Sequence, residues 1–223
     1  MKKFLRAAVF VLSALATAVF ILSFSIEAPI RARSFYYGGI DRYGLVEKSG
    51  ESRENIVAAY DELMDFLTKG APFGTGVFTC SDEARSHFED CAVLFAVDLA
   101  ALIISAVLLI GYAVLRVTGK VEAFKFSPVI IGAALTFIPI VFFGVFLLID
   151  ETAAYYFFHN LLFPGKLNWL FDSVNDNVIF ILPTQYFIEC GIMIGVIDAA
   201  LSAVFIAAGT VFTVKMRKNG KNA

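Results

Sequence analysis

The sequence predicts an all-α integral membrane protein with four transmembrane helices and an extracytoplasmic helical and loop region. Of its 223 residues, 59% are hydrophobic, a share well above that of an ordinary soluble domain. Four segments are long and apolar enough to cross a hydrocarbon core, which takes roughly 20 residues of helix: about 5–26, 91–115, 128–149 and 186–214. These runs are continuously apolar and lack the alternation of barrel strands, so we expect helices within a single membrane domain, residues 1–223.

The first span could also be read as a cleavable signal peptide. Lys2, Lys3 and Arg6 precede it, and small residues such as Ala16 and Ala18 resemble a cleavage site. Its apolar run is longer than the usual core of a signal peptide. We therefore expect a helix that stays attached.

Basic residues near the span ends predict how the chain is oriented. They occur at the N-terminus, between the second and third spans, and at the C-terminus: Lys2, Lys3, Arg6, Arg116, Lys120, Lys125, Lys215, Arg217, Lys218 and Lys221. The positive-inside rule places such residues in the cytoplasm. We expect a multi-pass protein of the cell membrane, with both termini cytoplasmic and the loops of about 27–90 and 150–185 on the extracytoplasmic face.

Both predicted outer loops carry more acidic than basic residues. This charge, and the lack of zinc-finger spacing or a phosphate-binding glycine loop, gives no reason to expect a nucleic-acid partner. In the first loop, ENIVAAYDELMDFLTK (54–69) has apolar residues at helical spacing and is followed by Gly70 and Pro72. We expect an amphipathic helix that rests on the bilayer surface or on the tops of the spans.

Three cysteines, Cys80, Cys91 and Cys190, fall at or near the predicted outer face. We interpret them as small apolar residues that fill space, although one pair could be oxidised there. None has an adjacent histidine in the sequence and no GxSxG motif occurs, so a covalent mechanism has no support. Asp98 and Asp198 lie within spans, where a carboxyl group is either functional or hydrogen-bonded to a neighbouring helix.

The segment CSDEARSHFED (80–90) leads into the second span and contains one of only two histidines. Ser81 is a suitable N-cap, and residues three and four apart share a helix face. Glu83, His87 and Asp90 therefore line up, and a carboxylate on each side could orient the imidazole. A solvated charged face at the membrane surface would explain the same spacing.

The other histidine, His159, lies in the segment YYFFHNLLF (155–163), which Pro164 and Gly165 interrupt. The region beyond it contains the only tryptophan, Trp169, and we expect a re-entrant or interfacial element there. Aromatic residues gather at the lipid–water interface, so a simple aromatic belt would also account for these rings.

A site that combines the two histidines would suit general acid–base chemistry near neutral pH. Two imidazoles are too few for catalytic zinc, which takes three protein ligands, and no HExxH helix is present. We therefore favour a site without metal or cofactor. Its place at the interface selects a substrate with one end in lipid and one in water, which fits acyl transfer.

Two segments, SDEARSHFEDCAVLF and FFHNLLFPGKLNWLFDSVNDNVIFILPTQYF, resemble the paired motifs of a four-span bacterial membrane family that includes the lipoprotein intramolecular transacylase, Lit. The matching residues are Glu83, His87, Asp90, His159, Phe163, Trp169, Asp176 and Pro183. The resemblance implies that the sn-2 acyl chain of a diacylglyceryl group moves to the α-amino group of a lipoprotein's N-terminal cysteine, leaving a lyso-form lipoprotein. It implies a diacylglyceryl-modified lipoprotein N-terminus and membrane lipid as partners.

This resemblance makes His87 and His159 the candidate catalytic residues, with Glu83, Asp90, Asp176 and Trp169 in support. We expect His87, oriented by Glu83 or Asp90, to act as the base, and His159 to bind the oxyanion or shuttle the proton. The two roles could be exchanged. The alternative is a non-enzymatic membrane protein whose acidic outer region docks a partner.

Overall fold

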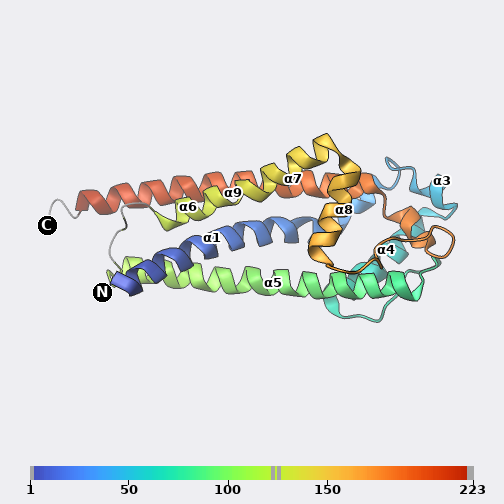
Figure 1. The fold of residues 1–223 in the computed structure, drawn as a ribbon, viewed down its shortest axis with the longest axis horizontal. Helices are drawn as coiled ribbons and strands as arrows, with labels where there is room; N and C mark the ends of the chain where they lie inside the picture. The colour runs from blue at the N-terminus through green and yellow to red at the C-terminus, as the bar shows by residue number, and fades with distance from the viewer. Residues whose placement is uncertain (1–2, 122–123, 125–126, 220–223) are drawn as a thin grey trace. The chain divides into compact units, whose positions relative to one another are not determined.

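Figure 1 shows the computed structural model, in which every regular element among the described residues is a helix. The described residues are 3–121, 124 and 127–219; Lys2, Lys125 and Lys221, which contributed to the predicted orientation, lie outside them. The elements are α1 (Lys3–Arg31), α2 (Arg33–Gly39), α3 (Leu45–Ser49), α4 (Arg53–Lys69), α5 (Asp82–Val117), α6 (Pro128–Leu135), α7 (Phe137–Ile149), α8 (Glu151–Leu162), the 3₁₀ helix η1 (Asn177–Ile181) and α9 (Thr184–Asn219). The predicted all-α class is confirmed.

Within the described residues, four helical stretches are long and apolar enough to cross a membrane, which confirms the predicted number of spans. They are Lys3–Arg31, Asp82–Val117, Pro128–Ile149 and Thr184–Val214. The third consists of α6 and α7, which meet at Thr136, and the fourth begins directly after Pro183, close to the predicted start at about 186.

The chain divides into two compact units: residues 1–28, 98–144 and 193–223 form one, and residues 29–97 and 145–192 form the other. In the first unit, small residues allow helices to approach closely. A Cβ atom at Gly132 of α6 would lie 2.2 Å from the carbonyl oxygen of Ala14 in α1, so only glycine fits there. The rings of Phe20 in α1 and Phe205 in α9 are 5.7 Å apart. These helices run side by side in Figure 1.

Asp198 lies in the same unit and is fully buried. Its Oδ1 atom is 2.9 Å from the Thr136 hydroxyl, which in turn is 3.0 Å from the hydroxyl of Ser202. A carboxyl group inside hydrocarbon requires such partners. The cluster joins α9 to the break between α6 and α7. Of the two roles expected for Asp198, this agrees with the structural one, a hydrogen bond to a neighbouring helix.

The second unit has its own core, built largely around α4. Ser52 caps the start of this helix and Gly70 ends it with a left-handed φ of 68°, so the predicted amphipathic helix is confirmed. Its apolar face packs on other protein segments rather than on the bilayer surface. The ring of Tyr60 stacks on that of Tyr36 in α2 at 3.6 Å, and the Tyr36 hydroxyl donates to the carbonyl of Ile181 in η1 at 2.7 Å.

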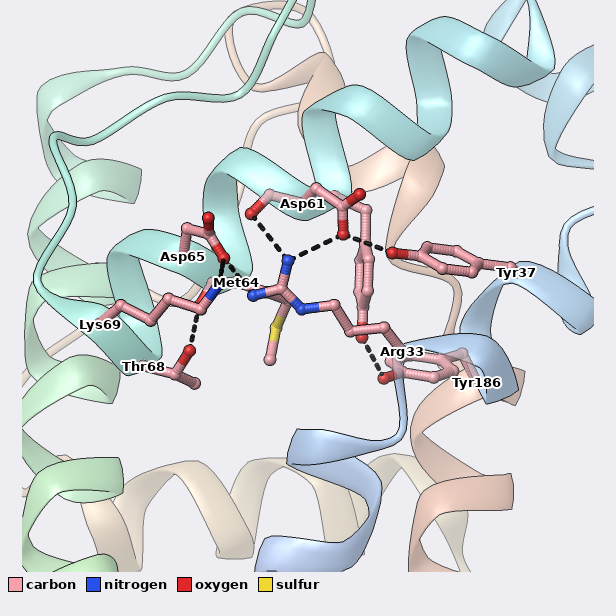
Figure 2. A network of polar contacts seen from close by, with 9 residues as sticks. Arg33, Tyr37, Asp61, Met64, Asp65, Thr68, Lys69 and Tyr186 are labelled. Carbon is pink, nitrogen blue, oxygen red and sulfur yellow. Dashed lines mark hydrogen bonds and ion pairs between the residues drawn. The ribbon is translucent and has the colours of Figure 1, made fainter.

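A polar network links α2 to α4 (Figure 2). The guanidinium of Arg33 forms ion pairs with Asp61 and Asp65, and Lys69 lies 2.8 Å from the same Asp65 carboxylate. The Tyr37 hydroxyl also donates to Asp61. Hydrogen bonds from Lys69 and Arg33 hold the pKa of Asp65 below its ordinary value. Helix α4 is therefore held in the second unit by polar contacts as well as by its apolar face.

Candidate active site

His87 is positioned by the first two turns of α5. The helix begins after Ser81, whose hydroxyl accepts a hydrogen bond from the N–H of Ala84 at 3.1 Å, as the N-cap prediction requires. His87 as a whole residue is only 8% exposed. The rings of Phe163 and Phe171 lie against it, with ring centroids 4.7 and 5.7 Å away and planes inclined by 70° and 79°.

His159 is positioned by the last turn of α8. Asp150 caps the start of this helix by accepting a hydrogen bond from the N–H of Ala153 at 2.9 Å, and the helix ends before the turn at Gly165. The imidazole of His159 stacks on Trp169, with centroids 4.7 Å apart, and also contacts the ring of Tyr155 at 4.1 Å. Trp169 is 2% exposed, so the indole ring on which His159 stacks is held firmly within the second unit.

The two imidazoles lie next to each other, with ring centroids 5.9 Å apart and planes inclined by 38°. Phe163 contacts both rings. The structure thus brings together the two histidines that the sequence placed in separate loops, and it surrounds them with the aromatic residues of the second loop.

The tautomer of His159 follows from its backbone contact. Nδ1 lies 2.9 Å from the carbonyl oxygen of Tyr155, and a carbonyl can only accept, so Nδ1 carries the hydrogen. Burial lowers the pKa of His159 below its ordinary value, although the hydrogen bond to Tyr155 opposes this shift. The neutral ring therefore has its lone pair on Nε2, the arrangement of a general base.

His87 has a different environment. Its Nε2 atom lies 3.5 Å from the Sγ atom of Cys91, one helical turn further along α5. Its Nδ1 atom is buried and has no hydrogen-bond partner in the part of the chain that the structure describes. Burying a polar atom without a partner costs about 1–3 kcal/mol, which marks such an atom as a candidate functional group.

The carboxylates expected to orient His87 do not hydrogen-bond its ring. Asp90 instead accepts from the ammonium of Lys166 at 2.6 Å and from the side-chain amide of Asn168 at 3.0 Å. The indole N–H of Trp169 donates to the carbonyl of Lys166 at 2.9 Å. Asp90 thereby holds residues 163–171, which we call the strap, and the strap carries the rings that surround the histidines.

Glu83 and Asp176 line an open cavity of about 460 Å³, together with Cys80, Asp172 and other residues. Asp176 is buried and accepts hydrogen bonds from the N–H groups of Ser81 at 2.6 Å and Asp172 at 3.0 Å. Burial alone would raise the pKa of Asp176, but these hydrogen bonds outweigh it and lower the pKa. Asp176 therefore ties the second loop to the start of α5.

Two contacts of the site were not anticipated from the sequence. Cys91 follows His87 by four residues, and Tyr155 precedes His159 by four. This spacing places both pairs on shared helix faces. The four-residue spacing could have predicted both contacts. A cysteine with no histidine directly beside it in the sequence can still contact one that lies one helical turn away.

Comparisons with known proteins give the same fold and a family. The solved structure of the membrane-integral lipoprotein intramolecular transacylase Lit from Bacillus cereus matches with a TM-score of 0.86 at 19% identity, covering 97% of this chain and 99% of that one. Two variants of that protein, with one histidine replaced by arginine or alanine, match with TM-scores of 0.80 and 0.79 at 19% identity. The arginine variant covers 97% of this chain and 95% of its own, and the alanine variant 96% of each.

No curated protein sequence matches the chain significantly. The sequence profile of a family does match, over residues 11–187, which is most of the chain, and its description is lipoprotein intramolecular transacylase Lit. With four helices suited to crossing a membrane, this chain is a multi-pass membrane protein that belongs to the lipoprotein intramolecular transacylase (Lit) family.

Proposed function

We propose that this protein catalyses an intramolecular O-to-N acyl transfer on lipoproteins. The sn-2 acyl chain of the diacylglyceryl group moves to the α-amino group of the N-terminal cysteine, and a lyso-form lipoprotein results. The observation that carries the proposal is the pair of imidazoles, 5.9 Å apart, in a chain of the Lit family. Imidazoles titrate near neutral pH and can move a proton in both steps.

His159 is the base in this proposal. The α-amine has a reference pKa of about 8 and is readily available in neutral form. As its nitrogen attacks the ester carbonyl carbon, Nε2 of His159 takes the proton that the amine loses. The new N–C bond then remains while the C–O bond to the glyceryl oxygen breaks, and the same proton passes from His159 to that oxygen. No net proton is gained or lost.

His87 stabilises the oxyanion. Its buried Nδ1 atom can donate a hydrogen bond to the carbonyl oxygen as negative charge develops there. This reverses the expectation that His87 is the base, because the backbone contact of His159 leaves its Nε2 lone pair available. Both reacting groups belong to one molecule, which removes much of the entropic cost of their meeting.

The site works at the membrane surface on the extracytoplasmic side. The basic residues at the N-terminus and near Arg116 support this orientation, because they favour the opposite, cytoplasmic side. Next to the histidines, α8 exposes apolar side chains that suit contact with lipid, among them Phe157 and Leu161. Membrane lipid and the modified lipoprotein N-terminus are then the partners, and no nucleic acid is involved.

The test is to express the chain in a bacterial strain that lacks this activity and to measure the N-terminal peptide of one lipoprotein by mass spectrometry. We expect the N-acyl, S-monoacylglyceryl peptide with the wild-type chain, and a loss of at least about a hundredfold with His87→Ala or His159→Ala. Equal amounts of wild type and variants in the membrane are the control. If the wild type yields only the diacylglyceryl peptide, the acyl-transfer proposal is wrong, and a docking protein becomes the better explanation.

A further inference from the structure

We propose that Cys91 is a positioning residue that sets the tautomer of His87. Its thiol donates a hydrogen bond to Nε2, which keeps the hydrogen of the neutral ring on Nδ1. The role in catalysis rests on the function proposed above, whereas the tautomer itself can be measured without any activity.

The contact is directional. Cys91 Sγ lies 3.5 Å from His87 Nε2, within the range for a hydrogen bond that involves sulfur, and Cys91 is a free cysteine. An unprotonated imidazole nitrogen is a good acceptor, while a thiol sulfur accepts only weakly. The arrangement S–H to N is therefore preferred over N–H to S.

The ring is also prevented from exchanging its two nitrogens. The rings of Phe163 and Phe171 lie against it, with centroids 4.7 and 5.7 Å away, and His87 is almost fully buried. A flip about the last side-chain bond would have to displace these rings. The nitrogen that faces Cys91 therefore stays Nε2, and the hydrogen-bonding character of Nδ1 depends on the thiol.

The two histidines then have complementary tautomers. The Tyr155 carbonyl fixes His159 with the lone pair on Nε2, and the Cys91 thiol fixes His87 with a hydrogen on Nδ1, for which the described residues offer no partner. One ring can accept a proton and the other can donate a hydrogen bond, which is what acyl transfer through a tetrahedral intermediate requires. Without the thiol, the hydrogen of His87 could move to Nε2 and the oxyanion would lose its donor.

The experiment uses ¹⁵N-histidine labelling of the full chain in detergent micelles. Only two histidines are present, so the imidazole nitrogen signals are few, and His159→Gln assigns those of His87. We expect the Nδ1–H tautomer for His87 in the wild type and a shift toward Nε2–H in Cys91→Ala. Cys91→Ser, whose hydroxyl can still donate, should keep much of the wild-type pattern. A wild-type ring that is already Nε2–H, or no change in Cys91→Ala, overturns the proposal.

Activity gives the second readout. Cys91→Ala should lower the rate about five- to tenfold with little change in apparent substrate affinity, and Cys91→Ser should recover at least half of the loss. Cys190→Ala, at another free cysteine that packs against the core of the second unit, is the matched control for removal of a thiol and should leave the rate unchanged. A thioester on Cys91, detected by intact mass and removed by hydroxylamine, would instead make this residue a nucleophile and overturn the positioning role. If the wild type makes no N-acyl product, the proposed function fails while the tautomer measurement still stands.

Discussion

The carboxylate of Asp90 forms an ion pair with Lys166, at 2.6 Å between Oδ1 and Nζ, and makes no hydrogen bond to the neighbouring His87. This contact joins two segments 76 residues apart in the chain. Because Asn168 binds the other oxygen of the same carboxylate, Asp90 fixes the strap at two points. It acts on the histidines through the aromatic rings that the strap carries.

Asp90→Ala should therefore lower activity through loss of geometry. We expect a decrease of roughly ten- to a hundredfold in rate, because small displacements of a positioned group have effects of this size. Asp90→Asn keeps an acceptor for Asn168 but loses the ion pair, and it should fall between the wild type and Asp90→Ala. The measurement is product formation by mass spectrometry at matched protein levels. Glu89→Gln, which removes only an exposed pair with Arg85, is the control; an equal effect of both changes would contradict the role of the strap.

Trp169 should matter for both stability and activity. Its ring is buried against His159, so Trp169→Ala removes a large side chain from a packed site, at a cost of about 3 kcal/mol. Trp169→Phe retains an aromatic wall but loses the hydrogen bond to the Lys166 carbonyl, and it should be less harmful. Thermal unfolding in detergent and the rate of product formation are the two measurements. Wild-type behaviour of Trp169→Ala in both would show that the wall is dispensable.

The lowered pKa of His159 predicts the acid side of the pH–rate profile. A base works only in its neutral form, so the rate should fall as the pH drops through the pKa of His159. Because burial places that pKa below its ordinary value of about 6.5, His159 alone should keep the rate above half of its maximum at pH 6.5. The α-amine of the substrate, with a reference pKa of about 8, adds a separate dependence at higher pH. A lipoprotein analogue with a less basic amine distinguishes the two groups. It should shift only the part of the pH–rate profile that is due to the amine, and leave the part due to His159 in place.

The four helices suited to crossing a membrane were predictable because lipid restricts the structures that can span it. A chain in hydrocarbon must satisfy its backbone polar groups within each segment, so long apolar runs become helices. The capped start of α5 was also predicted, because Ser81 acts locally on the first turn of the helix. In contrast, α2 and α3 are short and have no strong caps, and contacts with α4 and η1 stabilise them. Local sequence contains no signal for such contacts.

The candidate site was predictable only as far as local sequence motifs reach. Motifs around His87 and His159 pointed to both residues, but the partner of Asp90 could not be read from spacing on one helix. Glu83, His87 and Asp90 do share a face of α5, yet Lys166 approaches from the second loop and offers Asp90 a stronger partner than a neutral imidazole. Competition between partners distant in the sequence decides such cases.

The network around Arg33 predicts a pH-dependent contribution to stability. The pKa of Asp65 is lowered in the folded protein, so its ion pairs stabilise the fold at neutral pH and this contribution is lost as the pH falls below about 4. Both Arg33→Gln and Asp65→Asn should lower the unfolding temperature by roughly 2 °C at pH 7, because the pairs are partly exposed. The double variant should lose little more than either single one. High salt should shrink the difference from the wild type, and full additivity would argue against a direct interaction.

The assignment of base and donor can be tested by replacing each histidine with asparagine. An asparagine amide can donate a hydrogen bond to an oxyanion, but it cannot take a proton from an attacking amine. If His87 is the donor and His159 the base, His87→Asn should retain measurable product formation, at about a tenth to a hundredth of the wild-type rate. His159→Asn should be as inactive as His159→Ala, and added free imidazole should restore part of its activity. The reverse order, with His159→Asn the more active variant, would show that the roles are exchanged and that His87 accepts the proton.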